Sequence, residues 1–308
     1  MPRVPDPRYR GGLALGTAQL GMDYGIANRG GRPTGEDAFA TLDAAWEAGI
    51  RVFDTAPGYG AAEELLGDWL VDRAAWDAVV VTKLDAAVDA GDVESVTAAV
   101  AASHERLHGP PDCLLLHDPE AVSRWALVAP ALRTCLDRGL VRRIGVSVYE
   151  PEQLEEALRH EEISVVQAPT NALDRRIVDS GLLAGGLASG RTIIVRSVFL
   201  QGILVLAPSE LPPPLAFAAP TVERWRALCE RHELAPDAAA LRWVRTVASD
   251  ALVVVGCESA LQVARNVALW QAGPLDEAFL AEVAGLPPAP ERLLDPRAWS
   301  EVGDGPSL

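Results

Sequence analysis

Cysteine is scarce in this sequence, and the few cysteines follow no recognisable pairing pattern. Four cysteines occur among 308 residues, without a C-x-x-C pair and without histidines at zinc-finger spacing. The sequence therefore indicates neither a disulfide framework nor a zinc ribbon. We expect free, buried thiols in a reducing compartment, which favours a cytoplasmic location. The four are Cys113, Cys135, Cys229 and Cys257.

Long apolar runs and positive charge are also scarce. Residues 1–6 lack the apolar core of a signal peptide, and the most apolar stretch, residues 192–207, is interrupted by Arg196 and Gln201 and is too short to span a bilayer. Lys and Arg number 27 against 43 Asp and Glu, a formal net charge of -16 at pH 7. This balance opposes contact with nucleic-acid phosphates and anionic lipid. We expect neither a nucleic-acid partner nor a membrane.

Short β-branched or Leu-rich runs, by contrast, recur along most of the chain and alternate with helical patterns. Strands separated by helical segments of this length pair in parallel. A series of eight, with no break in composition between the halves, favours a single (β/α)8 barrel over a doubly wound sheet. The barrel should span about residues 12–270. The predicted strands are residues 13–15, 51–54, 79–83, 113–117, 143–146, 164–167, 192–195 and 252–255.

The segments between these runs show helical spacing. After the first run, Phe39, Leu42 and Trp46 recur at helical intervals, and Gly49 is suited to the position just beyond a helix end. Further helices are predicted near residues 61–70, 92–108, 121–138, 151–159, 174–186, 221–249 (as one helix or two) and 259–270.

Two segments exceed what a minimal barrel requires. Residues 197–220 follow the seventh strand and contain five prolines, which predicts a long irregular loop of the kind that serves as a lid or binding loop. Residues 271–308 form a Pro-rich C-terminal extension, and the alternative for its final ten residues is a disordered terminus. We expect residues 1–308 to form a single domain.

Three of the apolar runs end on an ionisable residue, and a tyrosine follows the first of them. Asp54, Lys83 and His117 each close a run, and Tyr59 lies in the turn after Asp54. Taken singly, Asp54 could cap a turn, Tyr59 could pack on the surface, and Lys83 and His117 could be solvated. The carboxyl ends of barrel strands converge on the rim where active sites are built. Together the four residues therefore predict one proton-transfer cluster.

These four residue types suit the reduction of a carbonyl group. A tyrosine with a pKa near its usual value of about 10 is a poor proton donor at neutral pH. We expect the Lys83 ammonium to lower the pKa of Tyr59, with Asp54 holding Lys83 in place. His117 could hydrogen-bond the carbonyl oxygen and orient it. Because no protein side chain donates hydride, the scheme requires a nicotinamide cofactor.

The same stretches resemble the aldo-keto reductases, barrel enzymes that reduce aldehydes and ketones with NADPH and less often NADH. The resemblance runs from residue 12 to about residue 270. It implies that Asp54, Tyr59, Lys83 and His117, spaced by five, 24 and 34 residues, form the catalytic tetrad. The matching stretches are residues 15–17, 49–56 with Tyr59-Gly60, Thr82-Lys83, 115–117, 145–147, Gln167 with Asn171, and 254–256 followed by Asn266.

The resemblance also implies a cofactor site. Ser147 and Gln167 match positions that bind the nicotinamide carboxamide. Residues 197–202 match the loop that crosses the pyrophosphate. Residues 256–266 match the segment that binds the adenosine half of the cofactor. A loop that opens a helix suits phosphate. The cofactor residues so implied are Gly16, Thr17, Asp54, Ser147, Gln167, Arg196, Ser197, Leu200, Gln201, Gly202, Gly256, Cys257, Glu258, Ser259, Gln262, Arg265 and Asn266. No metal ligand is predicted.

Departures from the family pattern bear on which cofactor is bound. Arg196 stands where a Tyr or Trp often stacks on the nicotinamide. Gly256 and Gln262 replace basic residues that hold the 2′-phosphate of NADP in many members. Arg265 is then the nearest candidate for that phosphate, and Glu258 would oppose it if its side chain points inward. NADPH is expected with a modest preference, and NADH is possible.

Three functions remain in view. The first is an NAD(P)H-dependent reductase or alcohol dehydrogenase acting on a small aldehyde, ketone or sugar. The second is a regulatory barrel that binds the cofactor with little turnover, which the intact tetrad disfavours. The third, a metal-dependent isomerase or hydrolase, needs several His and carboxylate ligands on the rim, but only His117 of five histidines ends a strand. The sequence leaves the substrate and the oligomeric state open.

Overall fold

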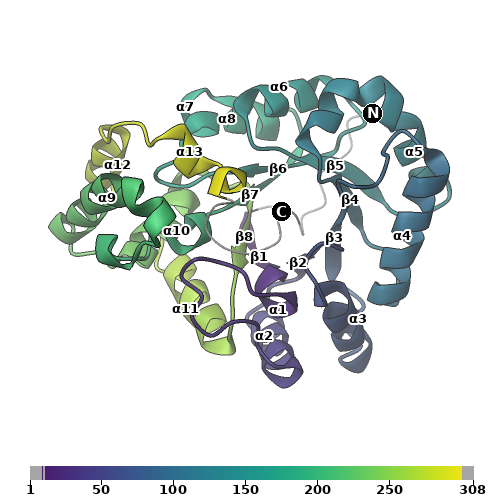
Figure 1. Cartoon of the computed structure of the whole chain (residues 1–308), viewed down its shortest axis with the longest axis horizontal. Coiled ribbons are helices and arrows are strands. Elements are labelled where there is room, and N and C mark those ends of the chain that lie inside the picture. Colours follow the sequence, from purple (N-terminus) through teal and green to yellow (C-terminus); the bar gives the residue numbers. More distant parts are fainter. Residues whose placement is uncertain (1–8, 10, 300–308) are drawn as a thin grey trace.

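The computed structural model describes Tyr9 and residues 11–299, and its centre is a closed barrel of eight strands in chain order (Figure 1). All neighbouring strands are parallel, and the last pairs with the first over five residue pairs, from Gly12 with Leu252 to Gly16 with Gly256. The predicted barrel is confirmed, and each predicted strand end lies within two residues of the observed one. The strands are β1 (Gly12–Gly16), β2 (Val52–Asp54), β3 (Val79–Leu84), β4 (Cys113–Leu116), β5 (Arg143–Ser147), β6 (Val165–Pro169), β7 (Thr192–Arg196) and β8 (Leu252–Gly256).

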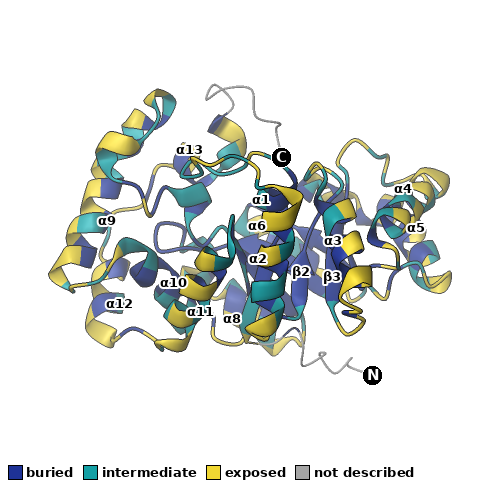
Figure 2. Cartoon of the chain, turned by 90° about the horizontal axis from the view of Figure 1, so that it is seen from below, coloured by how far each residue is buried: buried dark blue, intermediate teal, exposed yellow. Residues whose placement is uncertain are grey.

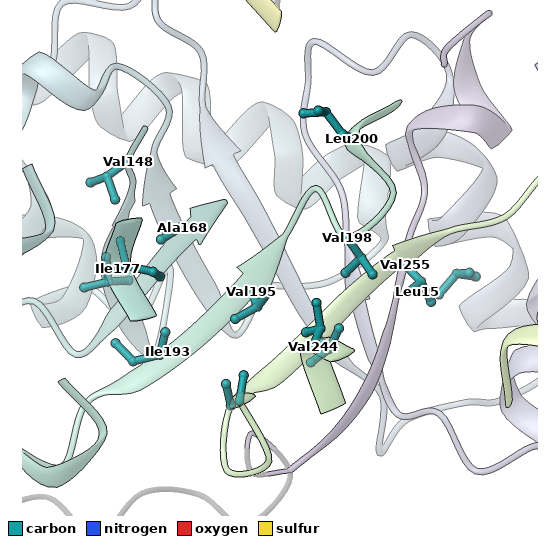
Figure 3. Packing of buried hydrophobic residues seen from close by; sticks show 14 of the residues in the cluster. Leu15, Val148, Ala168, Ile177, Ile193, Val195, Val198, Leu200, Val244 and Val255 are labelled. Carbon is teal, nitrogen blue, oxygen red and sulfur yellow. The ribbon is translucent and has the colours of Figure 1, made fainter. Parts of the chain in front are cut away.

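The strands are apolar on both faces because both faces are buried. In β7, Ile194 belongs to the cluster that fills the barrel, whereas its neighbours Ile193 and Val195 belong to the larger cluster between strands and helices (Figure 3). Successive side chains of a strand point to opposite faces, so a continuous β-branched run fills both layers. This explains why the strands appear in the sequence as uninterrupted apolar runs.

Helices surround the barrel, with exposed residues on their outer faces and buried residues toward the strands (Figures 1 and 2). Among the described residues, no helix is long and apolar enough to cross a membrane. The helices are α1 (Ala18–Gly21), α2 (Gly35–Glu47), α3 (Ala62–Asp72), α4 (Val93–Leu107), α5 (Trp125–Asp137), α6 (Pro151–Arg159), α7 (Arg176–Asp179), α8 (Leu182–Ala188), α9 (Ala219–Arg231), α10 (Pro236–Val247), α11 (Ala260–Gln271), α12 (Glu277–Ala284) and α13 (Glu291–Leu294).

Two helix predictions need correction. The helix expected at residues 174–186 is divided into α7 and α8, because Gly181 between them adopts a left-handed conformation with φ of 76°. The helix expected at residues 121–138 begins as a 3₁₀ helix, η2 (Pro119–Arg124), before α5. The segment expected at residues 221–249 as one helix or two forms two helices, α9 and α10.

The two additional segments are both ordered where described. The loop after β7 is built of short 3₁₀ turns, η3 (Leu200–Gly202), η4 (Pro208–Glu210) and η5 (Pro213–Ala218), which confirms a long loop there. The C-terminal extension forms α12, α13 and η6 (Pro296–Trp299). The alternative of a disordered terminus concerns mainly residues 300–308, which lie outside the described residues.

The C-terminal extension packs against α9 through an aromatic contact. Phe279 of α12 is 1% exposed, and its ring meets Trp225 of α9 edge-on at 6.2 Å and His232 at 5.1 Å. Trp225 in turn donates from its indole nitrogen to the Leu204 carbonyl in the loop after β7, at 2.9 Å. The extension and the rim loop therefore share one packed support.

Phe279→Ala should lower the free energy of unfolding by about 3 kcal/mol, because it removes a fully buried ring and leaves a cavity beside Trp225. Chemical denaturation followed by circular dichroism measures this difference. Leu261→Ala, at a side chain that is 80% exposed, is the matched control and should change stability by less than about 0.5 kcal/mol. Equal stability of the two variants would show that the extension contributes nothing to the fold.

Candidate active site

A cavity of about 430 Å³ opens at the carboxyl ends of the strands, within the size range of ligand pockets. Asp54 of β2, Tyr59 of the following turn and His117 after β4 all line it. Lys83 of β3 lies beneath the cavity wall and is 1% exposed. The barrel thus brings the four residues that the sequence predicted to one place.

The floor of the cavity is a buried ion pair. Lys83 Nζ donates to Asp54 Oδ1 at 2.7 Å and to the Thr55 carbonyl at 2.9 Å. The second carboxylate oxygen of Asp54 accepts from Gln167 Nε2 at 2.7 Å, and Ser147 Oγ donates to Gln167 Oε1 at 3.3 Å. Both charges are nearly removed from water, and these further hydrogen bonds offset the cost of that burial. Side chains from β2, β3, β5 and β6 therefore meet in one polar network.

Tyr59 stands above this pair and keeps its proton. The Lys83 ammonium lies 4.7 Å from the centre of the tyrosine ring. Burial raises the pKa of Tyr59 well above its usual value, and the nearby Asp54 carboxylate raises the pKa further. The expectation of a lowered pKa was wrong, because burial and the Asp54 carboxylate outweigh the Lys83 ammonium. The phenol is fully protonated at neutral pH.

His117 is the complementary group and carries no charge. Burial lowers the pKa of His117 to about 3, and the positive charges of Lys83 and Arg196 contribute to the same shift. Its ring meets that of Tyr59 edge-on, with 6.3 Å between centroids. A neutral imidazole can donate a hydrogen bond from one ring nitrogen but has no acidic proton to transfer at neutral pH. Of the two groups, only Tyr59 is a proton donor.

Most of the residues implied as cofactor ligands line the cavity, and four do not. Leu200 is buried, Thr17 donates to the Asp54 carbonyl at 3.1 Å, and Ser259 caps α11 by accepting from the Gln262 amide. Cys257 accepts from Asn266 at 3.3 Å. These four support the wall from behind. Those that line it are Gly16, Asp54, Ser147, Gln167, Arg196, Ser197, Gln201, Gly202, Gly256, Glu258, Gln262, Arg265 and Asn266.

The wall formed by β1 and β8 ends on two glycines. Gly16 and Gly256 are paired residues at the carboxyl ends of these strands, and both line the cavity. A Cβ on Gly256 would approach the end of the Gln19 side chain to 2.3 Å, so Gln19 would have to move for any larger residue. The N-terminus of α11 begins directly beyond it, where backbone N–H groups favour phosphate. The residues present therefore fit a nicotinamide dinucleotide.

Charge is unevenly distributed along the cavity. Asp54 is balanced by Lys83, and Arg265 is paired with the Asp237 carboxylate. Among the described lining residues, this leaves Arg196 at the Tyr59 end and Glu258 at the α11 end without an opposite charge at ion-pair distance. Glu258 accepts from Gln262 Nε2 at 3.2 Å, and burial raises the pKa of its carboxyl group. The two ends of the cavity thus carry opposite charges.

Sequence reasoning missed five polar lining residues: Gln19, Tyr24, Asn28, Tyr149 and Asp237. Tyr24 and Gln19 lie in the segment after β1, and Tyr149 follows β5 by two residues, so none of them ends an apolar run. Asp237 reaches the cavity from the first turn of α10. Only the position of Tyr149, just beyond a strand end, gave a signal that could have been used.

Among the described residues, no group of three or more His, Cys, Asp or Glu side chains is placed so that it could bind a metal ion. The four other histidines lie in or at the ends of helices, His104 and His108 on α4, His160 after α6 and His232 after α9.

Comparison with known proteins gives one consistent match. The model of the Aldo/keto reductase family matches residues 12–286. The D-threo-aldose 1-dehydrogenase of a Pseudomonas species is 29% identical over 295 residues, which cover 82% of this chain and 90% of that protein. The NADH-specific methylglyoxal reductase of Escherichia coli K12 is 26% identical over 264 residues, covering 74% of this chain and 81% of that protein.

Solved structures show the same fold. The holo form of an aldo-keto reductase from Bacillus halodurans superimposes with a TM-score of 0.71 at 22% identity, covering 92% of this chain and 95% of that one. A glycerol dehydrogenase from Gluconobacter oxydans gives a TM-score of 0.69, also at 22% identity, covering 92% and 94%.

Tyr59→Phe should bind cofactor normally and lose about 10²–10⁴-fold in turnover of a carbonyl substrate, because the ring stays while the acidic proton is removed. Stopped-flow measurement of the first turnover isolates this step. Tyr24→Phe is the matched control, since Tyr24 is a second cavity tyrosine whose pKa burial raises, and it should lose far less. Equal losses in both variants would show that Tyr59 is not the donor.

Lys83→Met should be nearly inactive and less stable by about 3–5 kcal/mol, because Asp54 is left as a buried charge without a partner. The double variant with Asp54→Asn should recover much of the stability and none of the activity. Denaturation and turnover measured on the same preparations distinguish these effects. Normal activity of Lys83→Met would contradict a role for the pair in catalysis.

Proposed function

The chain belongs to the aldo/keto reductase family, and on that premise we propose that it reduces the carbonyl group of a small aldehyde, ketone or sugar with NADH, using Tyr59 as the proton donor. The observation that carries this proposal is geometric: Tyr59 and His117 line one cavity over the buried Lys83–Asp54 ion pair, and the Lys83 ammonium lies 4.7 Å from the centre of the tyrosine ring. Burial keeps Tyr59 protonated and His117 neutral, so Tyr59 has a proton to transfer and His117 can position the carbonyl.

The roles of the chain's own residues follow from this assignment. Tyr59 transfers its hydroxyl proton to the carbonyl oxygen as that oxygen gains negative charge. Neutral His117 donates a hydrogen bond to the same oxygen and fixes its direction. The Lys83 ammonium, 4.7 Å from the tyrosine ring, stabilises the phenolate that remains. The bound nicotinamide supplies the hydride that reaches the carbonyl carbon.

Gln167 is assigned to the ion pair as well as to the cofactor. Its amide nitrogen is bound to Asp54 and its amide oxygen accepts from Ser147. Gln167 therefore fixes the Asp54 carboxylate, which is the partner of Lys83. Ser147 in turn fixes Gln167. We propose that this chain of contacts also sets the position of the nicotinamide carboxamide above Ser147.

The substrate class is supported by the relatives and by the lining of the cavity. The relatives named above act on an aldose and on methylglyoxal, which are small polar carbonyl compounds. Around Tyr59 and His117 the cavity is lined by the hydroxyl groups of Tyr24 and Tyr149 and by Arg196. A protonated tyrosine above an intact ion pair supports turnover over the alternative of a regulatory barrel.

The charges at the adenosine end support NADH. Arg265, the residue expected to hold a 2′-phosphate, is bound by Asp237, and both line the cavity. Glu258 also lines it, so this end has two carboxylates against one guanidinium. A 2′-phosphate placed there would meet net negative charge, whereas the 2′-hydroxyl of NADH would be a hydrogen-bond donor to a carboxylate. We therefore propose NADH in place of the modest NADPH preference that was expected from the family resemblance and Arg265.

NADH should bind about tenfold tighter than NADPH, a difference of about 1.4 kcal/mol. Glu258→Gln should reduce this ratio and Gln262→Arg should reverse it, because each makes the site more positive without changing its shape greatly. Quenching of tryptophan fluorescence gives both dissociation constants. Glu64→Gln, on the exposed face of α3, is the matched control for net charge.

The reaction is tested by following loss of NADH absorbance with a panel of aldehydes, ketones and sugars. Reduction of at least one by the wild type, and reduction about 10²–10⁴-fold slower by Tyr59→Phe, is the expected result. Tight binding of NADPH with a ratio unmoved by Glu258→Gln would contradict the cofactor assignment. Cofactor binding without turnover of any carbonyl would favour the regulatory alternative.

A further inference from the structure

We propose that Arg196 binds an anionic group of the substrate, a carboxylate or a phosphate ester, so that the enzyme selects carbonyl compounds that carry negative charge. The proposal rests on the reductase function above and specifies its substrate class. It starts from the position of Arg196 at the carboxyl end of β7, in the same cavity as Tyr59 and His117. Its positive charge contributes to the low pKa of His117 and partly opposes the rise in the pKa of Tyr59.

Arg196 is held in place by neutral partners. Its two terminal nitrogens donate to Ser197 Oγ and to the Val148 carbonyl, each at 3.0 Å. Its guanidinium carbon lies 4.2 Å from the centre of the Tyr149 ring. A guanidinium has more N–H donors than these two bonds use. Arg196 is therefore fixed in position and still able to donate to an anion, which reduces the entropy lost on binding.

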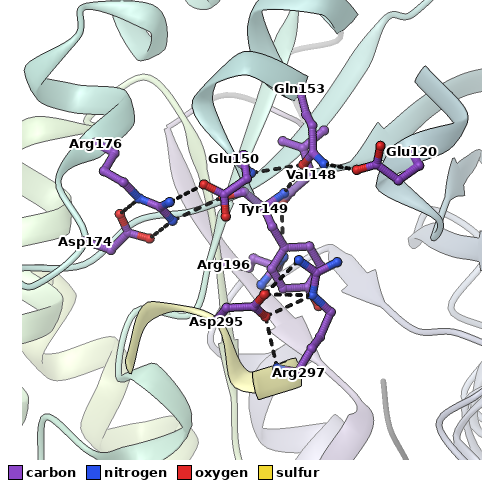
Figure 4. A network of polar contacts seen from close by, with 10 residues as sticks. All are labelled: Glu120, Val148, Tyr149, Glu150, Gln153, Asp174, Arg176, Arg196, Asp295 and Arg297. Carbon is purple, nitrogen blue, oxygen red and sulfur yellow. Dashed lines mark hydrogen bonds and ion pairs between the residues drawn. The ribbon is translucent and has the colours of Figure 1, made fainter. Parts of the chain in front are cut away.

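Asp295, a carboxylate whose pKa the charge of Arg196 helps to lower, is already engaged. Asp295 accepts from Arg297 at both oxygens, with Nε to Oδ1 at 2.9 Å and Nη2 to Oδ2 at 2.8 Å. Arg297 also lies over the Tyr149 ring, at 3.8 Å, so the C-terminal extension supports the face on which Arg196 rests (Figure 4). Among the described residues, no carboxylate lies within ion-pair distance of Arg196, and Asp295, whose charge it attracts from further away, is already paired with Arg297.

The rest of this end of the cavity has no net charge. Lys83 and Asp54 cancel, His117 is neutral and Tyr59 is protonated. Arg196 is thus the one net charge among the described lining residues at the Tyr59 end, and it is separated along the cavity from Glu258. A substrate anion would supply the missing counter-charge in a partly desolvated site, where a charge-assisted hydrogen bond is strong.

Pairs of substrates that differ only in the charge test the proposal. Glyoxylate, pyruvate, succinic semialdehyde and glutaric semialdehyde are each compared with their methyl esters, and glyceraldehyde phosphate is compared with glyceraldehyde. For at least one pair, kcat/KM should be about 10- to 100-fold higher for the anion. The semialdehyde and phosphate arms distinguish a carboxylate from a phosphate ester as the preferred group.

Variants of Arg196 connect this preference to the residue. Arg196→Gln retains donors but removes the charge, and should bring the anion-to-neutral ratio of kcat/KM close to one. Arg196→Lys should keep part of the ratio. Arg138→Gln is the matched control, since Arg138 is exposed at the end of α5, away from the cavity-lining residues, and it should leave the ratio unchanged. The ratio is informative because a general loss of activity affects both members of a pair.

Four results would overturn the inference. If the wild type reduces neutral carbonyls as well as their anionic counterparts, Arg196 does not select charge, while the reductase function stands. If Arg196→Gln keeps the ratio but weakens NADH binding more than tenfold, Arg196 belongs to the cofactor site. If the wild type reduces other carbonyls of the wider panel but no member of any pair, the inference fails and the reductase function stands; if it binds NADH and reduces no carbonyl at all, both fail.

Discussion

A carboxylate and an ammonium lie 2.7 Å apart beneath the cavity, with side chains that are 6% and 1% exposed. Burying either charge alone would cost several kcal/mol, and their attraction offsets this only when their remaining hydrogen-bonding groups are also satisfied. Here Thr55 accepts from Lys83 and Gln167 donates to Asp54. These partners come from β2, β3 and β6, which surround one point only when the barrel is closed. The site is therefore a consequence of the whole sheet.

Burial has the largest influence on the ionisation of the two neighbours of this pair, and each member of the pair adds to it. Asp54 helps Tyr59 to retain its proton, and Lys83 helps to keep His117 neutral. Among the described lining residues, charge without a partner at ion-pair distance lies at the two ends of the cavity, on Arg196 and Glu258. We therefore assign proton transfer and carbonyl orientation to Tyr59 and His117 at the centre of the cavity. Glu258 is assigned to the preference for NADH, and Arg196 to the preference for an anionic substrate.

Much of this arrangement was predictable from the sequence. Apolar runs that stop on Asp54, Lys83 and His117 identified both the strands and the rim, because in parallel sheets the strand is apolar until it leaves the core. The break of one helix at Gly181 was not recognised, since glycine is also tolerated within helices. The pKa of Tyr59 was assigned in the wrong direction, because the sequence places a lysine and a carboxylate nearby but does not show how deeply the phenol is buried. The Arg265–Asp237 pair joins residues 28 positions apart and has no local pattern.

The protonated state of Tyr59 is the claim on which the assignment of roles depends, and it can be measured directly. Ultraviolet difference titration of the wild type against Tyr59→Phe isolates the ionisation of this one phenol. The account predicts that no tyrosinate from Tyr59 forms below about pH 10 in the cofactor-free protein. A tyrosinate that forms with a pKa near 8 or below would show that the Lys83 ammonium outweighs burial and Asp54, and would contradict the account.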